Sequence, residues 1–265
     1  MIRYRLMRAS VGSHRVVVGV LLCFGCGCSS VTTAPVKQTA GGEVMLIPGI
    51  DGRVSRLRGV QRGLREAGLS RDIEVFPWGE SSIWALRNLV DLPANQRRAE
   101  AIAARLVAFR RDHPSEPLTL VGFSGGGGLA ILCAELLPDG VMLDRIILVA
   151  GAISQDYDLS RVLRHCTDGL INFYSEKDGI VGWGTTLFGT IDRKKTVSAG
   201  HSGFVDDAGR LRHEKKLVQI PWSPAWTQYG HFGGHIGYLS PLWAQHVLAA
   251  QIDPSLASLH HPTSP

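Results

Sequence analysis

The chain has 265 residues, of which 45% are hydrophobic and 19% charged, and this composition is typical of one sizeable globular domain rather than a disordered chain. The formal charge of +5 does not indicate a nucleic-acid partner, because four arginines lie between Arg3 and Arg15, before the first acid at Glu43. Without residues 1–27, 24 basic and 23 acidic side chains remain, so the basic character belongs to the N-terminal segment.

That segment begins with the arginines and continues with an apolar run over residues 16–25. The run is too short for a comfortable transmembrane helix, and a basic start followed by such a run is typical of a secretory signal. We therefore expect residues 1–27 to be a signal peptide and the protein to be exported.

The end of the run, Cys23-Phe-Gly-Cys26-Gly-Cys28-Ser-Ser, resembles a bacterial lipoprotein signal. In that family a small residue precedes a cysteine that is lipidated and becomes the mature N-terminus. The resemblance implies lipidation at Cys28, with Cys26 as the alternative, and a lipid-anchored protein of the cell envelope. An ordinary cleaved signal, and with it a secreted or periplasmic protein, stays open as the alternative.

The rest of the chain divides into three parts. Residues 28–42 are small and polar and predict a flexible tether, residues 43–252 predict the folded domain, and residues 253–265 are expected to be a disordered tail. Two cysteines remain in the domain, Cys133 and Cys166; a bridge between them is open, although the apolar surroundings of Cys133 favour a buried thiol.

Apolar runs alternate with amphipathic stretches throughout the domain. This alternation predicts parallel βαβ units, hence an α/β fold with a mostly parallel, doubly wound sheet flanked by helices. Extended segments are expected at Val44–Pro48, Ile73–Phe76, Leu118–Phe123, Arg145–Ala150, Leu170–Tyr174 and Leu217–Pro221, and helices at 53–67, 95–111, 126–137 and 241–251.

Residues 122–126, Gly-Phe-Ser-Gly-Gly, follow the expected strand 118–123 and precede the expected helix 126–137. A nucleophilic serine on a sharp strand-to-helix turn needs glycine two residues before and two after it, because side chains there would collide with the turn. The pattern predicts that Ser124 is a nucleophile. A glycine-rich phosphate loop is the alternative, but no Gly-Lys-Ser/Thr and no Gly-x-Gly-x-x-Gly accompanies it.

This strand–Gly-x-Ser-x-Gly–helix segment resembles the nucleophile elbow of the α/β-hydrolases, and the resemblance extends over most of 43–252. It implies an oxyanion hole made by a backbone amide after the first strand and by the amide that follows the nucleophile. In this chain these are the amides of Ile50, in Ile47-Pro48-Gly49-Ile50, and of Gly125. A plain turn is the alternative for the loop at Ile50.

The resemblance also implies the order nucleophile, acid, histidine along the chain. Asp178 follows the expected strand 170–174 in the family's pattern Ser-x-x-Asp-x-x-Val and is the expected acid, with Glu176, Asp156 and Asp158 as neighbouring candidates. Each of these carboxylates is otherwise a solvated loop residue.

The expected base is His235, because Gly233-Gly234-His235 precedes the last helix and resembles the family's terminal Gly-Gly-His segment. His231 is the alternative base. The glycines around the two histidines argue against a helical metal pair, so we expect neither a metal nor another cofactor.

Two features concern the surroundings of the site. Only about fifteen residues separate Ile153 from the strand at Leu170, which leaves no room for a large cap domain, whereas the longer segment 178–217 is a candidate flap over the site. Tryptophans near the expected strand ends could line an apolar pocket or pack at the rim of the sheet; they are Trp78, Trp84, Trp183, Trp222 and Trp226.

Together these features imply a serine hydrolase that acts on a small-molecule or lipid-like acyl substrate through Ser124, Asp178 and His235. An acyltransferase with the same triad and a non-catalytic envelope lipoprotein with this fold remain alternatives.

Overall fold

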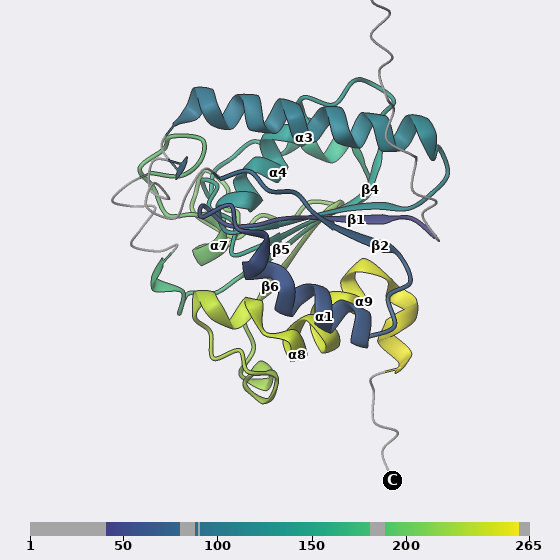
Figure 1. Ribbon diagram of the computed structural model, residues 1–265. Helices are drawn as coiled ribbons and strands as arrows, with labels where there is room; N and C mark the ends of the chain where they lie inside the picture. The colour runs from purple at the N-terminus through teal and green to yellow at the C-terminus, as the bar shows by residue number, and fades with distance from the viewer. Residues whose placement is uncertain (1–40, 80–87, 90, 181–188, 260–265) are drawn as a thin grey trace, which may run out of the picture. The chain divides into compact units, whose positions relative to one another are not determined.

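A sheet of six parallel strands forms the centre of the computed structural model (Figure 1). The described residues are 41–79, 88–89, 91–180 and 189–259, and they belong to one unit, Gln38–Pro265. The expected signal segment, with Cys26 and Cys28, lies outside them. The strands are β1 (Glu43–Ile47), β2 (Asp72–Val75), β3 (Leu118–Phe123), β4 (Leu143–Val149), β5 (Cys166–Tyr174) and β6 (Leu217–Pro221).

The strand order β2-β1-β3-β4-β5-β6 reverses direction at β1. The chain passes from β1 outward to β2 and then returns to add β3 on the other side of β1. Open α/β sheets bind ligands at the carboxyl edge beside such a switch point, because the loops after the two central strands diverge there. The loop after β1 contains Ile50 and the turn after β3 contains Ser124, so both lie at the switch point.

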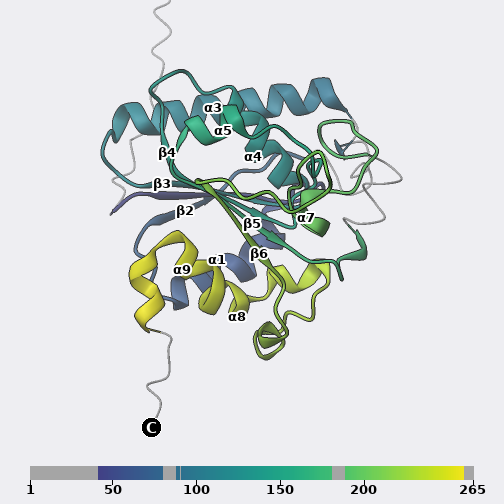
Figure 2. The ribbon, with the colours of Figure 1, turned by 180° about the vertical axis from the view of Figure 1, so that it is seen from behind.

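Helices cover both faces of the sheet (Figures 1 and 2). Along β1, Met45 and Ile47 pack in the cluster under one helical layer, and Val44 and Leu46 pack in the cluster under the other. Both faces of each central strand are thus buried, which explains the unbroken apolar runs in the sequence. The first layer contains α3 (Leu92–Asp112), α4 (Gly125–Glu135) and α5 (Ser160–Arg164), and the second contains α1 (Arg58–Glu66), preceded by η1 (Val54–Leu57), and the C-terminal helices.

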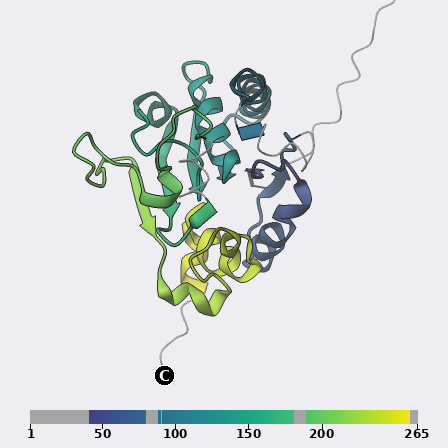
Figure 3. The same cartoon turned by 90° about the vertical axis from the view of Figure 1, so that its left-hand side faces the viewer.

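The C-terminal region differs from the expectation in two ways. The single helix expected over 241–251 is divided by a π-helical turn. Residues 254–259, the first part of the tail expected to be disordered over 253–265, form a 3-10 helix with buried Leu256. Leu256 packs in the same cluster as α1, and this burial orders the segment. Figure 3 shows the C-terminal helices, coloured yellow-green to yellow, across the sheet from α3. They are η3 (Pro224–Tyr229), η4 (His235–Leu239), α8 (Pro241–Trp243), η5 (Ala244–Leu248), α9 (Ala249–Ile252) and η6 (Pro254–Leu259).

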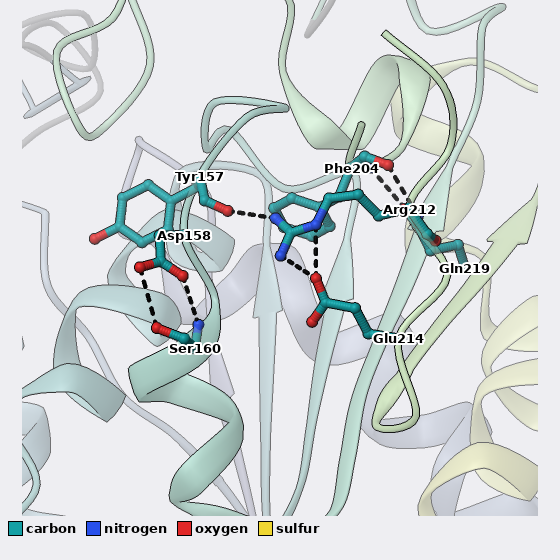
Figure 4. A network of polar contacts seen from close by, with 7 residues as sticks. All are labelled: Tyr157, Asp158, Ser160, Phe204, Arg212, Glu214 and Gln219. Carbon is teal, nitrogen blue, oxygen red and sulfur yellow. Dashed lines mark hydrogen bonds and ion pairs between the residues drawn. The ribbon is translucent and has the colours of Figure 1, made fainter. Parts of the chain in front are cut away.

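The connections beside the site are short or packed where they are described. Between β4 and β5 only α5 intervenes, so no large cap is inserted there. In the candidate flap, residues 181–188 lie outside the described ranges, and 189–217 contains α7 (Ala199–Ser202) with Phe204 buried beyond it. Gln219 Nε2 of β6 donates hydrogen bonds to the carbonyls of Phe204 and Arg212, both at 3.0 Å (Figure 4). Residues 198–204 of this segment are therefore packed beside the sheet, whereas residues 207–210 are exposed.

None of the helices within the described ranges has the length and apolar character that crossing a membrane requires.

Candidate active site

Ser124 occupies the sharp turn between β3 and α4. Its backbone has φ 56° and ψ −122°, a conformation that costs a residue with a side chain about 1–3 kcal/mol. The end of β4 holds this conformation, because Ser124 N donates to Val149 O at 2.9 Å and Ser124 O accepts from Ala152 N at 2.9 Å. The turn leaves the serine side chain 7% exposed at the carboxyl edge of the sheet.

The glycines of the elbow are required by close approaches of the backbone. A Cβ on Gly122 would lie 2.5 Å from Gly126 O, and a Cβ on Gly126 would lie 2.3 Å from Ile47 O. The additional glycines have the same explanation: Gly127 faces the Cα of Gly151 and Gly128 faces Ile191. The glycine run, unfavourable for a helix start, allows α4 to approach the loops after β1 and β4.

The loop after β1 lies directly against the elbow. A Cβ on Gly125 would lie 3.3 Å from Ile50 N, which brings the two expected oxyanion-hole residues into contact. Ile50 O accepts a hydrogen bond from Asn88 Nδ2 at 2.8 Å, and Pro48 O accepts one from Trp78 Nε1 at 2.7 Å. Within the described part of the chain, no hydrogen bond occupies the Ile50 amide.

Asp178 and His235 meet at the carboxyl edge of the sheet, where Ser124 also lies. His235 Nδ1 lies 2.7 Å from Asp178 Oδ2, and the side chains are 7% and 0% exposed. The second carboxylate oxygen, Oδ1, accepts from Ile180 N at 3.1 Å. The ring of His235 packs on Phe123, the residue before Ser124, with 4.8 Å between ring centroids. The structure thus brings His235 and Asp178 beside the elbow.

His231 has a different environment. The centroid of its ring lies 4.0 Å from that of Tyr238, the ring also packs against Trp226 and Trp243, and the residue is fully buried. Its Nδ1 accepts from Gly233 N at 3.2 Å, and no described residue is a hydrogen-bond partner for Nε2. Burial lowers the pKa of His231 to about 4, so this imidazole is neutral near pH 7.

The alternative acids have other contacts. Asp158 is exposed and accepts hydrogen bonds from Ser160 N at 2.9 Å and Ser160 Oγ at 3.0 Å (Figure 4); these bonds lower the pKa of its carboxyl. Asp156 is exposed and lies 3.0 Å from Lys194 Nζ, whose hydrogen bond lowers the pKa of Asp156. Glu176 is exposed on the loop of Asp178. Asp178 is the buried member of this group.

The two cysteines of the domain and several of its described tryptophans are buried. Cys133 and Cys166 are both buried and unbridged, and burial raises the pKa of each thiol. Trp78 and Trp226 are buried in the two hydrophobic clusters on either side of the sheet. Trp84 and Trp183 lie outside the described residues.

Sequence searches find no relative: no family model and no curated protein matches the chain. Among solved structures, lipase B of Aspergillus fumigatus is similar at 14% identity and a TM-score of 0.50; the match covers 84% of this chain and 57% of the lipase. The chain has the α/β-hydrolase fold. The esterase domain of a Rhodothermus marinus protein (14% identity, TM-score 0.40, 83% and 89% covered) and Paleococcus ferrophilus monoacylglycerol lipase (16%, 0.42, 82% and 94%) also match.

Within this α/β-hydrolase fold, several residues that support the site were not singled out by the sequence. Asn88 holds the carbonyl of Ile50, as described above. Ser175 Oγ, 2% exposed, donates to Gly233 O at 2.6 Å, and His201 Nδ1 lies 3.2 Å from Asp178 O. These contacts join segments that are far apart in the sequence. Of the residues involved, only Ser175 belongs to a pattern that the sequence analysis used, Ser-x-x-Asp.

Proposed function

We propose that the protein is a serine hydrolase that cleaves a carboxylic ester or a related acyl bond through Ser124, His235 and Asp178. The observation that carries this proposal is the buried 2.7 Å contact between His235 and Asp178, beside the strained elbow that presents Ser124. A histidine oriented by a carboxylate next to a serine on such a turn is the arrangement that activates a hydroxyl for attack on a carbonyl.

In the first half of the reaction, the Asp178 carboxylate accepts a hydrogen bond from Nδ1–H of His235, without taking the proton, and so fixes the tautomer whose Nε2 takes the Ser124 proton. The serine oxygen forms a bond to the substrate carbonyl carbon, and the carbonyl oxygen becomes negatively charged. The amides of Ile50 and Gly125 donate to that oxygen. The His235 imidazolium then gives its proton to the leaving alcohol, which departs and leaves the acyl group on Ser124.

In the second half, a water molecule takes the place of the alcohol. His235 removes its proton as the water oxygen attacks the acyl carbon, and the same amides stabilise the second tetrahedral intermediate. Return of the proton to the serine oxygen releases the acid and restores the enzyme. This sequence needs no metal or cofactor.

The rim of the site favours an apolar acyl substrate. Phe232 is 71% exposed and Ile236 is 61% exposed, on either side of His235 in the chain, and Ile180, two residues after Asp178, is 57% exposed. Exposed large apolar side chains next to site residues in the chain are candidate contacts for an apolar ligand. We therefore place lipid-like acyl esters first among the candidate substrates.

The test is covalent labelling of the full-length chain with a fluorophosphonate probe, combined with turnover of a short p-nitrophenyl ester. We expect labelling and turnover by the wild type and loss of both in Ser124→Ala, with an unchanged circular-dichroism spectrum. The exposed Ser160→Ala is the matched control and should behave as the wild type. A folded wild type that neither labels nor turns over would refute the proposal and favour a binding lipoprotein.

Product analysis separates hydrolysis from acyl transfer. With an alcohol or amine acceptor added, a hydrolase releases mainly the free acid, whereas an acyltransferase converts the acceptor to an ester or amide. Accumulation of the acceptor product at low acceptor concentration would replace hydrolysis by transfer as the reaction, with the triad unchanged.

We also propose that the N-terminal segment exports the protein and anchors it to the cell-envelope membrane through a lipid on Cys28, with Cys26 as the second candidate. The support for this proposal is the sequence of residues 16–30. In cells fed an alkyne-tagged fatty acid, we expect the label to disappear in Cys28→Ser. Loss only in Cys26→Ser would move the site, and label that survives the double replacement would refute the anchor.

A further inference from the structure

Ser175 connects the loop of the candidate acid to the loop of the candidate base. Its carbonyl accepts from Asp178 N at 2.9 Å, and its hydroxyl donates to Gly233 O at 2.6 Å, two residues before His235. The side chain is buried, and its oxygen also accepts from Lys177 N at 3.3 Å. One hydroxyl thereby fixes the backbone on both sides of the His235–Asp178 pair.

Two further side chains support the same connection. Lys177 Nζ lies 4.1 Å from the centroid of the Trp222 ring, and Trp222 Nε1 donates to His231 O at 3.1 Å. The stem of Lys177 passes close to Gly233, where a Cβ would lie 2.8 Å from Lys177 Cδ. Gly233 has φ +94°, so this position favours glycine for its conformation as well as for space.

We propose that Ser175, Lys177 and Trp222 form a loop clamp that positions His235 for catalysis, with Ser175 as the principal positioning residue. The inference rests on the proposed function and adds to it. The clamp holds the carbonyls of His231 and Gly233, so it fixes the loop that presents His235 to Asp178 and to the elbow.

The expected effect of the clamp is on the rate of the chemical step. A catalytic group must be held within about 0.5 Å of its productive place, and a shift of about 1 Å can reduce the rate by about 100-fold. Ser175 is buried and bonded to backbone, so it does not touch the substrate. Loss of its hydroxyl should therefore lower kcat and leave KM nearly unchanged.

The experiment compares Ser175→Ala with Ser175→Thr, which keeps a hydroxyl, and with the exposed neighbour Glu176→Gln as the matched control. In the full-length chain we expect Ser175→Ala to lower kcat by about 10- to 100-fold with KM within about twofold. Ser175→Thr should recover most of the loss, and Glu176→Gln should match the wild type. A Ser175→Ala protein with wild-type kcat would overturn the inference.

A second measurement keeps the inference separable from the proposed function. The low-field proton resonance of the His235–Asp178 hydrogen bond is assigned by its absence in Asp178→Asn, and it needs no turnover. We expect this resonance to broaden or vanish in Ser175→Ala and to persist in Glu176→Gln; persistence in Ser175→Ala would overturn the clamp even if the wild type proved inactive. If Ser175→Ala does not fold, the double variant Lys177→Met/Trp222→Phe takes its place. A lower kcat with unchanged KM and a broadened or lost low-field resonance would support the clamp, and wild-type values of both would overturn it.

Discussion

His235 Nδ1 lies 2.7 Å from Asp178 Oδ2, although the two residues are 57 positions apart in the chain. Both are buried, so the carboxylate can orient the imidazole with little competition from water. Asp178→Asn keeps the shape of the side chain but offers an amide N–H or a neutral oxygen, and either weakens the orientation and the stabilisation of the imidazolium. We expect kcat to fall on the order of 10³- to 10⁴-fold, measured on a short p-nitrophenyl ester.

The matched control for this change is Asp158→Asn, because Asp158 accepts its hydrogen bonds from Ser160 at the start of α5. We expect it to retain activity within about twofold, with at most a small loss of stability, about 0.5–1.5 kcal/mol, from the weakened hydrogen bonds to Ser160. A large loss in Asp158→Asn with activity surviving in Asp178→Asn would move the acid to the loop after β4.

A prediction on stability concerns Gly126 in the elbow. A methyl group there would lie 2.3 Å from Ile47 O and 2.4 Å from Pro48 O, which are backbone atoms of the end of β1 and its loop. Although alanine is favoured over glycine in a helix by about 1 kcal/mol, we expect Gly126→Ala to lower the free energy of unfolding by about 1–3 kcal/mol. Urea denaturation measures it, and Gly151→Ala, whose nearest contact would be at 3.5 Å, is the control. Equal stability of the two variants would contradict the close approach.

The predicted α/β-hydrolase fold is confirmed. It could be predicted because its elements are visible as local patterns in the sequence. Both faces of the sheet are buried, so each strand is a short apolar run that the sequence displays directly. Ser124 could be singled out in the same way, since its strand, its glycines and its helix are contiguous. Asp178 and His235 were predicted from their places after strands, and their roles stay predictions.

The supporting contacts could not be predicted, because they join residues that no sequence pattern links. The hydroxyl of Ser175 bonds to Gly233, 58 positions away, and Asn88 bonds to Ile50, 38 positions away. Likewise, the partner of Gly128 is the side chain of Ile191, which only the fold brings near. The order of residues 254–259 depends on burial of Leu256 in a core built by distant segments.

The apolar rim predicts a dependence on acyl chain length. Replacing exposed Phe232 by Ser removes apolar surface three residues before His235 in the chain, and a partial contact of this kind is worth about 1 kcal/mol, roughly a fivefold change. We expect Phe232→Ser to lower kcat/KM for long-chain esters by about that factor and to leave short-chain esters unchanged. Leu136→Ser is the control, since Leu136 is 39% exposed at the end of α4. An equal change of kcat/KM for long-chain and short-chain esters would show that the acyl chain does not contact Phe232.

His231 predicts a pH dependence of stability. Its pKa is lowered from 6.5 to about 4 by burial, so between these values the unfolded chain binds a proton that the folded protein does not. The free energy of unfolding therefore falls as the pH drops through this window, by about 3 kcal/mol for a shift of this size. Glu43 has the opposite effect just above pH 4.5, because burial raises the pKa of its carboxyl.

Urea denaturation at pH 7, 6, 5 and 4.5 measures this slope, and His231→Asn isolates it. Asparagine keeps an acceptor for Gly233 N but does not titrate, so we expect a lower stability at pH 7, from lost contact with Tyr238, and a weaker dependence on pH.

The same variant tests the alternative base. Because His231 is neutral and enclosed by aromatic rings, its replacement should preserve Ser124-dependent turnover at pH 7 within about tenfold. In contrast, His235→Ala should reduce turnover by several orders of magnitude. Turnover lost in His231→Asn and kept in His235→Ala would assign the base to His231. An unaltered pH slope in His231→Asn would show that its imidazole binds a proton as readily in the folded protein as in the unfolded chain.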